Sequence, residues 1–182
     1  MFIQTEATPN PLTLKFMPGV PVMETGTAFF TSAEDAKLSP LAEALFRNAG
    51  VTAIFLGADF VTVTKSVDDS WELLKPALLT GIMDHFVAGK PVMLTPGIKA
   101  VVDENDSDIV KQIKELIETR VRPAVAQDGG DIIYRGFEDG IVQLELHGSC
   151  SGCPSSTITL KNGIENMLKH YVPEVVAVEA VN

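Results

Sequence analysis

Both cysteines of this chain lie in one short stretch, Gly148-Ser149-Cys150-Ser151-Gly152-Cys153-Pro154, with two residues between them. Before this stretch, apolar and polar residues alternate from Ile141 to His147, the period-two pattern of a strand with one buried face. After it, apolar residues recur at three- and four-residue steps from Pro154 to about Tyr171, which predicts an amphipathic helix with proline in its first turn. We therefore expect the two thiols in a strand-to-helix loop, at the N-terminus of the helix.

This position favours thiols that bind or react. The thiolate is both the nucleophile and the metal ligand, and a helix N-terminus stabilises it through free amide N–H groups and the positive end of the helix dipole. Gly148 and Gly152 let the backbone approach whatever the sulfurs hold. We expect Cys150 and Cys153 to be exposed and to act as a pair.

The composition excludes several classes of protein. The 182 residues are 46% hydrophobic and 21% charged, which is ordinary for a globular protein. No apolar run approaches the roughly 20 residues that span a bilayer, and Met1–Glu6 has neither the basic nor the apolar part of a leader. The net charge of -10, without a basic stripe, disfavours nucleic acid. Two closely spaced cysteines are typical of an intracellular metal-binding or redox pair. We expect no nucleic-acid partner and no membrane partner.

Residues 1–89 predict a first domain without chemistry of its own. Its pattern is strands, helix, hairpin and helix, an α+β unit with an antiparallel sheet. Ser39 is expected to cap the first helix, Asp69-Ser70 precedes the second, and Pro76 falls inside the second helix without breaking it. His85, the only histidine of the segment, is expected at the surface or beside the helix C-terminus rather than as a ligand. The predicted strands are 2–5, 12–16, 51–56 and 60–65.

A linker is expected at 90–106, because this segment is rich in proline and glycine and ends in the acidic run 103–106, whose end should cap the next helix. Residues 107–182 then predict a compact domain of α-β-β-α-β order, with its first helix closing near Pro123. The fold class is α+β, with two small α/β-sandwich-like domains.

Four interpretations of the cysteine pair compete. The cysteines could be surface residues without a role, a dithiol-disulfide oxidoreductase, or a zinc site with His147 as an extra ligand. His147 falls on the same strand face as Gln143 and Glu145, so we expect it to face solvent or to order the loop. The fourth interpretation is an iron-sulfur cluster, which needs four thiolates and therefore a homodimer of chains with two each. The residues alone leave the last three open.

Two sets of motifs resemble a known family. The run Gln127-Asp128-Gly129-Gly130-Asp131, the cysteine stretch continued to Thr157 and the helix after it resemble the NifU C-terminal domain. The first segment resembles the Nfu N-terminal domain through Thr8-Pro9-Asn10-Pro11, Ser39-Pro40-Leu41-Ala42, Gly50-Val51 and 59–65. Their order is characteristic of Nfu-type iron-sulfur cluster proteins of bacteria and mitochondria.

The resemblance implies an iron-sulfur cluster scaffold or carrier that is not an enzyme. Cys150 and Cys153 from each of two chains would hold a [4Fe-4S] cluster at the dimer interface, with [2Fe-2S] the less favoured alternative. Apo iron-sulfur client proteins and upstream cluster donors would be its partners. The expected location is the bacterial cytoplasm, with the mitochondrial matrix as the alternative. De novo cluster assembly is not implied, because the chain lacks the cysteine-rich scaffold and ferredoxin-like domains of full-length NifU.

Overall fold

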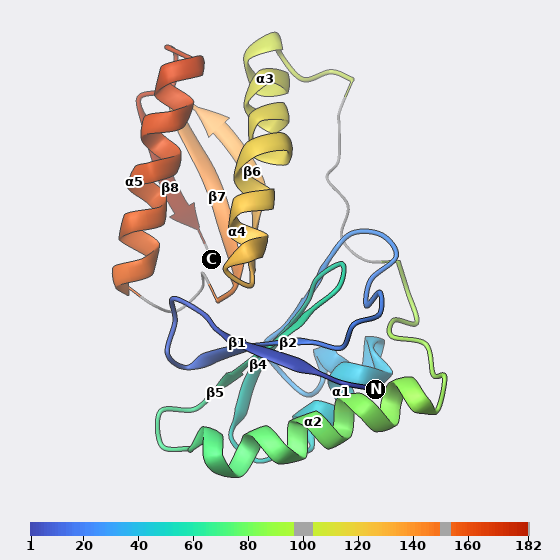
Figure 1. The fold of residues 1–182 in the computed structure, drawn as a ribbon. Helices are drawn as coiled ribbons and strands as arrows, with labels where there is room; N and C mark the ends of the chain where they lie inside the picture. The colour runs from blue at the N-terminus through green and yellow to red at the C-terminus, as the bar shows by residue number, and fades with distance from the viewer. Residues whose placement is uncertain (97–103, 150–153, 182) are drawn as a thin grey trace. The chain divides into compact units, whose positions relative to one another are not determined.

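The computed structural model describes residues 1–96, 104–149 and 154–181, and only the backbone of 154–157. The chain divides into two compact units, Met1–Lys99 and Ala100–Asn182. Each unit has a hydrophobic core of its own, so each is described by itself (Figure 1).

The first unit is built on a five-stranded sheet in the order β1-β2-β5-β4-β3, and each pair of neighbours is antiparallel. Its core is formed by one face of this sheet together with the helices that pack on it. The elements are β1 (Gln4–Ala7), β2 (Thr13–Met17), β3 (Ala28–Phe30), a 3-10 turn (Asp35–Leu38), α1 (Pro40–Phe46), β4 (Val51–Leu56), β5 (Val61–Lys65) and α2 (Trp71–Val87).

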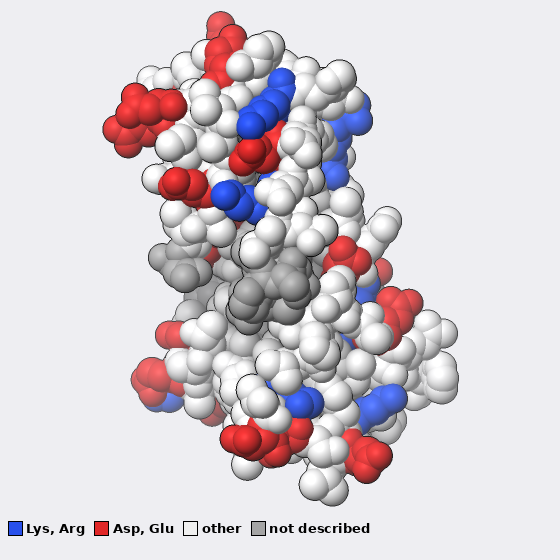
Figure 2. Space-filling model, turned by 90° about the vertical axis from the view of Figure 1, so that its left-hand side faces the viewer, with Lys and Arg blue, Asp and Glu red and all other residues white. Residues whose placement is uncertain are grey.

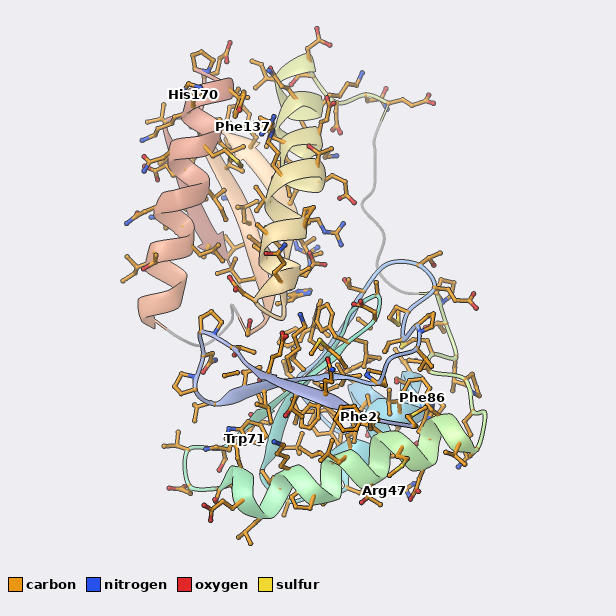
Figure 3. All side chains as sticks on the ribbon, viewed as in Figure 1. Phe2, Arg47, Trp71, Phe86, Phe137 and His170 are labelled. Atoms are coloured by element: carbon orange, nitrogen blue, oxygen red, sulfur yellow. The ribbon has the colours of Figure 1, made fainter. Side chains whose placement is uncertain are left out.

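Local sequence signals explain most of these boundaries. The Ser39 side chain accepts the N–H of Ala42 at 3.1 Å and caps α1, and Ser70 caps α2 in the same way. The β4–β5 hairpin forms as predicted, and Pro76 lies inside α2 without ending it. The indole of Trp71, at the start of α2, donates to the Pro11 carbonyl at 3.2 Å (Figure 3).

Several features of this unit differ from the prediction. The short strand β3 was not predicted, because three residues are too few to show a period. Part of the expected linker, Val92 and Met93, packs against the first core. The Ser39 hydroxyl donates to the Val92 carbonyl at 2.6 Å, and the Leu94 N–H donates to Leu38 at 2.9 Å. Such contacts cannot be read from the amino-acid composition of the segment, which was the basis for predicting a linker.

His85 lies in the last turn of α2, so the predicted place beside the helix C-terminus is confirmed, but the side chain is buried and the surface alternative is wrong. Its ring lies edge-on to Phe86, at 5.4 Å between centroids. Its Nε2 atom is buried and has no hydrogen-bond partner among the described residues. Burial, aided by the charge of Lys90, lowers the pKa of His85 below its ordinary value. Burial therefore favours the neutral imidazole over the charged one in the folded unit.

We expect the first unit to lose stability as the pH falls below about 6.5, where histidine is protonated in the unfolded chain but not in the folded one. One proton is involved, so the slope is at most about 1.4 kcal/mol per pH unit. Urea unfolding between pH 7.5 and 5 measures it, with His85→Leu as the non-titrating control. Equal slopes in both proteins would contradict this role of His85.

The second unit has the predicted α-β-β-α-β order. Strand β7 pairs antiparallel with β6 and parallel with β8. Figure 1 shows the helices on one side of this sheet, and Phe137 packs against the core that they form with it (Figure 3). The elements are α3 (Asp108–Leu116), a π-helical turn η2 (Ile117–Val121), α4 (Arg122–Gln127), β6 (Gly130–Glu138), β7 (Ile141–Gly148), α5 (Pro154–Tyr171) and β8 (Ala177–Val181).

The first helical segment does not close near Pro123, and this prediction is wrong. A proline inside a regular helix lacks the N–H of one hydrogen bond, and its ring crowds the carbonyl four residues earlier. Here the wider π turn relieves the conflict, because the N–H of Arg122 donates to Ile117, five residues back. Pro123 then occupies the first turn of α4, where proline is tolerated.

The cap of α3 is Ser107, whose side chain accepts the Val110 N–H at 3.3 Å. The acidic run was predicted to supply this cap. Its last residue, Asp106, forms an ion pair with Lys114 instead, at 2.5 Å. Serine and aspartate are both good caps, so the choice between adjacent residues depends on tertiary contacts.

The surface features bear on the expected partners. No helix in the described parts of the chain is long and apolar enough to cross a membrane. On the face that Figure 2 shows, lysine and arginine are scattered among aspartate and glutamate, and the described residues there form no continuous basic stripe.

Candidate functional site

The structure describes the two elements that flank the cysteine pair. Cys150 and Cys153 themselves lie outside the described residues, as does the rest of 150–153. Strand β7 ends at Gly148, and α5 begins at Pro154. The predicted strand and helix on either side of the thiols are therefore present, with the strand one residue longer than predicted.

The end of β7 is tied to the turn that precedes β6. The Ser149 hydroxyl donates a hydrogen bond to the Asp128 carbonyl, and the Ser149 N–H donates to Gly129 at 3.3 Å. In the same register Gly130 pairs with Gly148. The two motifs of the second domain, about twenty residues apart in sequence, are thus brought together by the β6–β7 ladder.

Glycine is required on both sides of this junction between the end of β7 and the turn before β6. Gly129 has φ of +80° and Gly148 has φ of +68°, a region that residues with a Cβ rarely occupy. The chain can therefore leave the turn and the strand end at the angles that bring Ser149 onto the Asp128 carbonyl.

A buried ion pair lies directly beside this turn. Arg122, at the start of α4, donates from Nε to one Asp131 carboxylate oxygen at 2.8 Å and from an Nη atom to the other at 2.7 Å. Its other Nη atom donates to Glu118 at 2.8 Å. The Asp131 side chain is only 4% exposed, and one of its oxygens also accepts the Ile132 N–H at 2.8 Å. Hydrogen bonding to Asp131 raises the pKa of Arg122 above its ordinary value, so the guanidinium is charged.

His147 is buried, and the prediction that it faces solvent is wrong. Its Nε2 atom forms a hydrogen bond with Glu145 at 2.7 Å. The other carboxylate oxygen of Glu145 pairs with Arg135. Burial opposes ionisation of Glu145, but the hydrogen bonds with His147 and Arg135 outweigh it and lower its pKa. His147 thus has a structural partner on its own strand face, which weakens its assignment as a zinc ligand.

Metal-ligand groups elsewhere do not compete with the thiols within the described residues. No group of three or more histidine, cysteine or acidic residues there could hold a metal ion. Cys150 and Cys153, the chain's only cysteines, lie outside the part of the chain to which this finding applies.

Sequence reasoning missed Arg122 entirely. Asp131 belongs to the Gln127–Asp131 motif, but nothing in the pattern pairs it with a residue nine positions earlier. The sequence offers one signal for this pair: Arg122 stands near the end of a helical segment, and Asp131 stands at the start of the next strand. That signal becomes informative only once the helix is known to run past Pro123.

The fold and this junction define a class: a two-domain α+β protein whose second domain carries a dithiol between a strand and a helix. Two family models match the chain, a NifU-like domain over residues 113–179 and the N-terminal domain of the scaffold protein Nfu/NifU over residues 3–89. They cover different units and occur in the order that the motifs indicated.

Curated relatives match along the whole chain. The human protein named NFU1 iron-sulfur cluster scaffold homolog, mitochondrial, is 56% identical over 184 residues, covering 100% of this chain and 72% of the relative. NifU-like protein 4, mitochondrial, of Arabidopsis thaliana is 55% identical, covering 98% of this chain and 65% of the relative. The NFU1 homolog of Drosophila ananassae is 52% identical, covering 100% and 64%.

A solved structure of a NifU-like protein from Saccharomyces cerevisiae is similar to 52% of this chain and 86% of that chain, with 24% identity and a TM-score of 0.47. The chain belongs to the family of Nfu-type iron-sulfur cluster scaffold proteins. It spans between about two thirds and three quarters of the length of the curated relatives named here.

Proposed function

We propose that this protein is an iron-sulfur cluster scaffold and carrier that binds a [4Fe-4S] cluster between two copies of the chain and passes it to apo-proteins. The observation that carries the proposal is the cysteine count. The chain has two cysteines, with two residues between them, in the segment between β7 and α5. A common cluster takes four thiolates, so two chains must each supply Cys150 and Cys153.

Support for the cargo comes from the family. Relatives that match the whole chain are named as iron-sulfur cluster scaffolds. Those names do not distinguish [4Fe-4S] from [2Fe-2S], and both clusters take four thiolates. We propose [4Fe-4S] because the resemblance to the NifU C-terminal domain implies it. Residues 1–89 would form the N-terminal domain, 90–106 the linker and 107–182 the cluster-binding domain.

Transfer needs no catalytic group. Each thiolate bond from Cys150 or Cys153 to iron is replaced by a bond from an acceptor cysteine, and the oxidation state of the cluster is unchanged. The protein would thus be a carrier rather than an enzyme, with upstream cluster donors and apo iron-sulfur clients as partners. The word mitochondrial in the names of the relatives supports the matrix as its location and gives no support to the bacterial cytoplasm.

A transfer assay tests the function. Protein reconstituted anaerobically with ferrous iron and sulfide is mixed with an apo-enzyme whose activity requires a [4Fe-4S] cluster, in the presence of a chelator that captures free iron. We expect the apo-enzyme to gain activity while the carrier loses its colour in proportion. Activation only when the chelator is omitted would contradict direct transfer.

The alternatives predict different products. A dithiol-disulfide oxidoreductase would be a colourless monomer that turns over disulfides, and a zinc-bridged dimer would be colourless and contain metal. Metal analysis and a disulfide-reduction assay on the same preparation separate the three.

A further inference from the structure

We propose that the Arg122–Asp131 ion pair is a positioning device for the cluster-binding loop, an inference that rests on the proposed function. The two side chains act through the turn at 128–130, which holds Ser149, the residue that precedes the first cysteine.

The ion pair is rigid. Both carboxylate oxygens of Asp131 are bound by the planar guanidinium of Arg122, at 2.8 and 2.7 Å, and one of them also accepts the Ile132 N–H. A bidentate pair fixes orientation as well as distance. Arg122 itself follows the π turn, which sets the direction from which it reaches Asp131.

The connection from this pair to the cysteines is short. Asp131 is the second residue of β6 and comes directly after Gly130. The turn before it supplies two backbone carbonyls, from Asp128 and Gly129, and both accept hydrogen bonds from Ser149. Cys150 is the next residue. Fixing Asp131 therefore fixes the point and direction at which the chain enters the loop.

The charge of Arg122 is already balanced. It is bound by the carboxylates of Asp131 and Glu118, so it offers no net positive charge to the thiolates. Its effect on them is therefore geometric. By holding the chain at the start of the loop, the ion pair reduces the conformational freedom that the two thiols lose when both sulfurs bind one centre. The ion pair should therefore strengthen the binding of ligands that need both sulfurs.

A buried ion pair is a weak means of stabilising a fold, since apolar residues of similar volume often serve as well. Residues that orient metal ligands, however, typically change metal affinity by about 10- to 100-fold when they are replaced. A variant that lowers ligand affinity while the domain stays folded therefore separates a positioning role from a role in stability.

The test compares Arg122→Gln/Asp131→Asn with wild type. Removing both charges leaves no uncompensated buried ion, so the domain should fold, which far-UV circular dichroism checks. Arg135→Gln is the matched control, since it breaks the other arginine-carboxylate pair of this sheet, the one with Glu145. Arg122→Lys keeps the positive charge but loses the planar guanidinium that binds both carboxylate oxygens of Asp131. We expect it to behave like the double variant.

Two readouts are taken, both well below the unfolding temperature. The first is the half-life of the reconstituted cluster under a chelator, with its visible circular dichroism spectrum. The second is the affinity of the reduced apo-protein for a trivalent arsenical, which binds both sulfurs of a dithiol and needs no iron. We expect the double variant to lose its cluster about tenfold faster, to bind the arsenical about tenfold more weakly and to show an altered spectrum. Arg135→Gln should remain within about twofold of wild type.

The two proposals fail in different ways. Wild type that binds no cluster refutes the proposed function, while the arsenical affinities still decide the role of Arg122 and Asp131. A folded double variant whose arsenical affinity and cluster half-life equal those of wild type refutes the positioning role and leaves the carrier function intact.

Discussion

Replacing Cys150 with alanine is expected to abolish stable cluster binding, and Cys153→Ala should do the same. A dimer of either variant offers two thiolates in place of four, and among the described residues no other group could hold a metal ion. Iron and sulfide are measured after anaerobic reconstitution and gel filtration. Wild type should retain both, and each variant should retain only background amounts.

The control for these variants is the fold. The substitutions leave the described residues of both hydrophobic cores unchanged, so far-UV circular dichroism and the unfolding midpoint should stay close to those of wild type. A folded variant that still held the full complement of iron and sulfide would show that the ligands had been assigned to the wrong residues.

Leu168→Ala is expected to destabilise the second unit by roughly 3 kcal/mol, because it removes a fully buried side chain and leaves a cavity. Leu168 belongs to α5, the helix that begins directly after the cysteines, and packs in the second core. For a domain of this size each kcal/mol lowers the midpoint by about 4–8 °C, so a drop of more than 10 °C is expected.

The matched variant is Leu45→Ala, which removes an equally buried leucine from the first core. Because the two cores are separate, each variant should lower one thermal transition and leave the other in place. A single transition that both variants shift equally would contradict the description of the chain as two independently packed units.

The parts of the fold that could be predicted are those whose signal is local. The β4–β5 hairpin, the caps at Ser39 and Ser70, and the strand and helix on either side of the cysteines all follow from alternation, helical spacing and turn residues. These patterns arise because one face of each element is buried, which the sequence records residue by residue.

The features that could not be predicted depend on contacts between distant residues. The helix continues past Pro123 because a π turn absorbs the proline, and no local rule signals such a turn. His85 and His147 are buried by their surroundings, although each lies on a face that looked exposed. Arg122 meets Asp131 only after helix and strand are packed together.

The candidate site also combines features that could be predicted from the sequence with features that could not. The C-x-x-C spacing identified the ligands that we propose, and the resemblance identified their family. The hydrogen bonds from Ser149 to Asp128 and Gly129, and those between Arg122 and Asp131, could be found only in the folded chain. Position along the sequence does not reveal such support.

The most direct test of the central claim is the native mass of the protein after anaerobic reconstitution with ferrous iron and sulfide. The account predicts one dominant species of two chains with about four iron and four sulfide, which Cys150→Ala does not form. A single chain that carries a whole cluster, or a colourless monomer whose two thiols cycle to a disulfide, would contradict it.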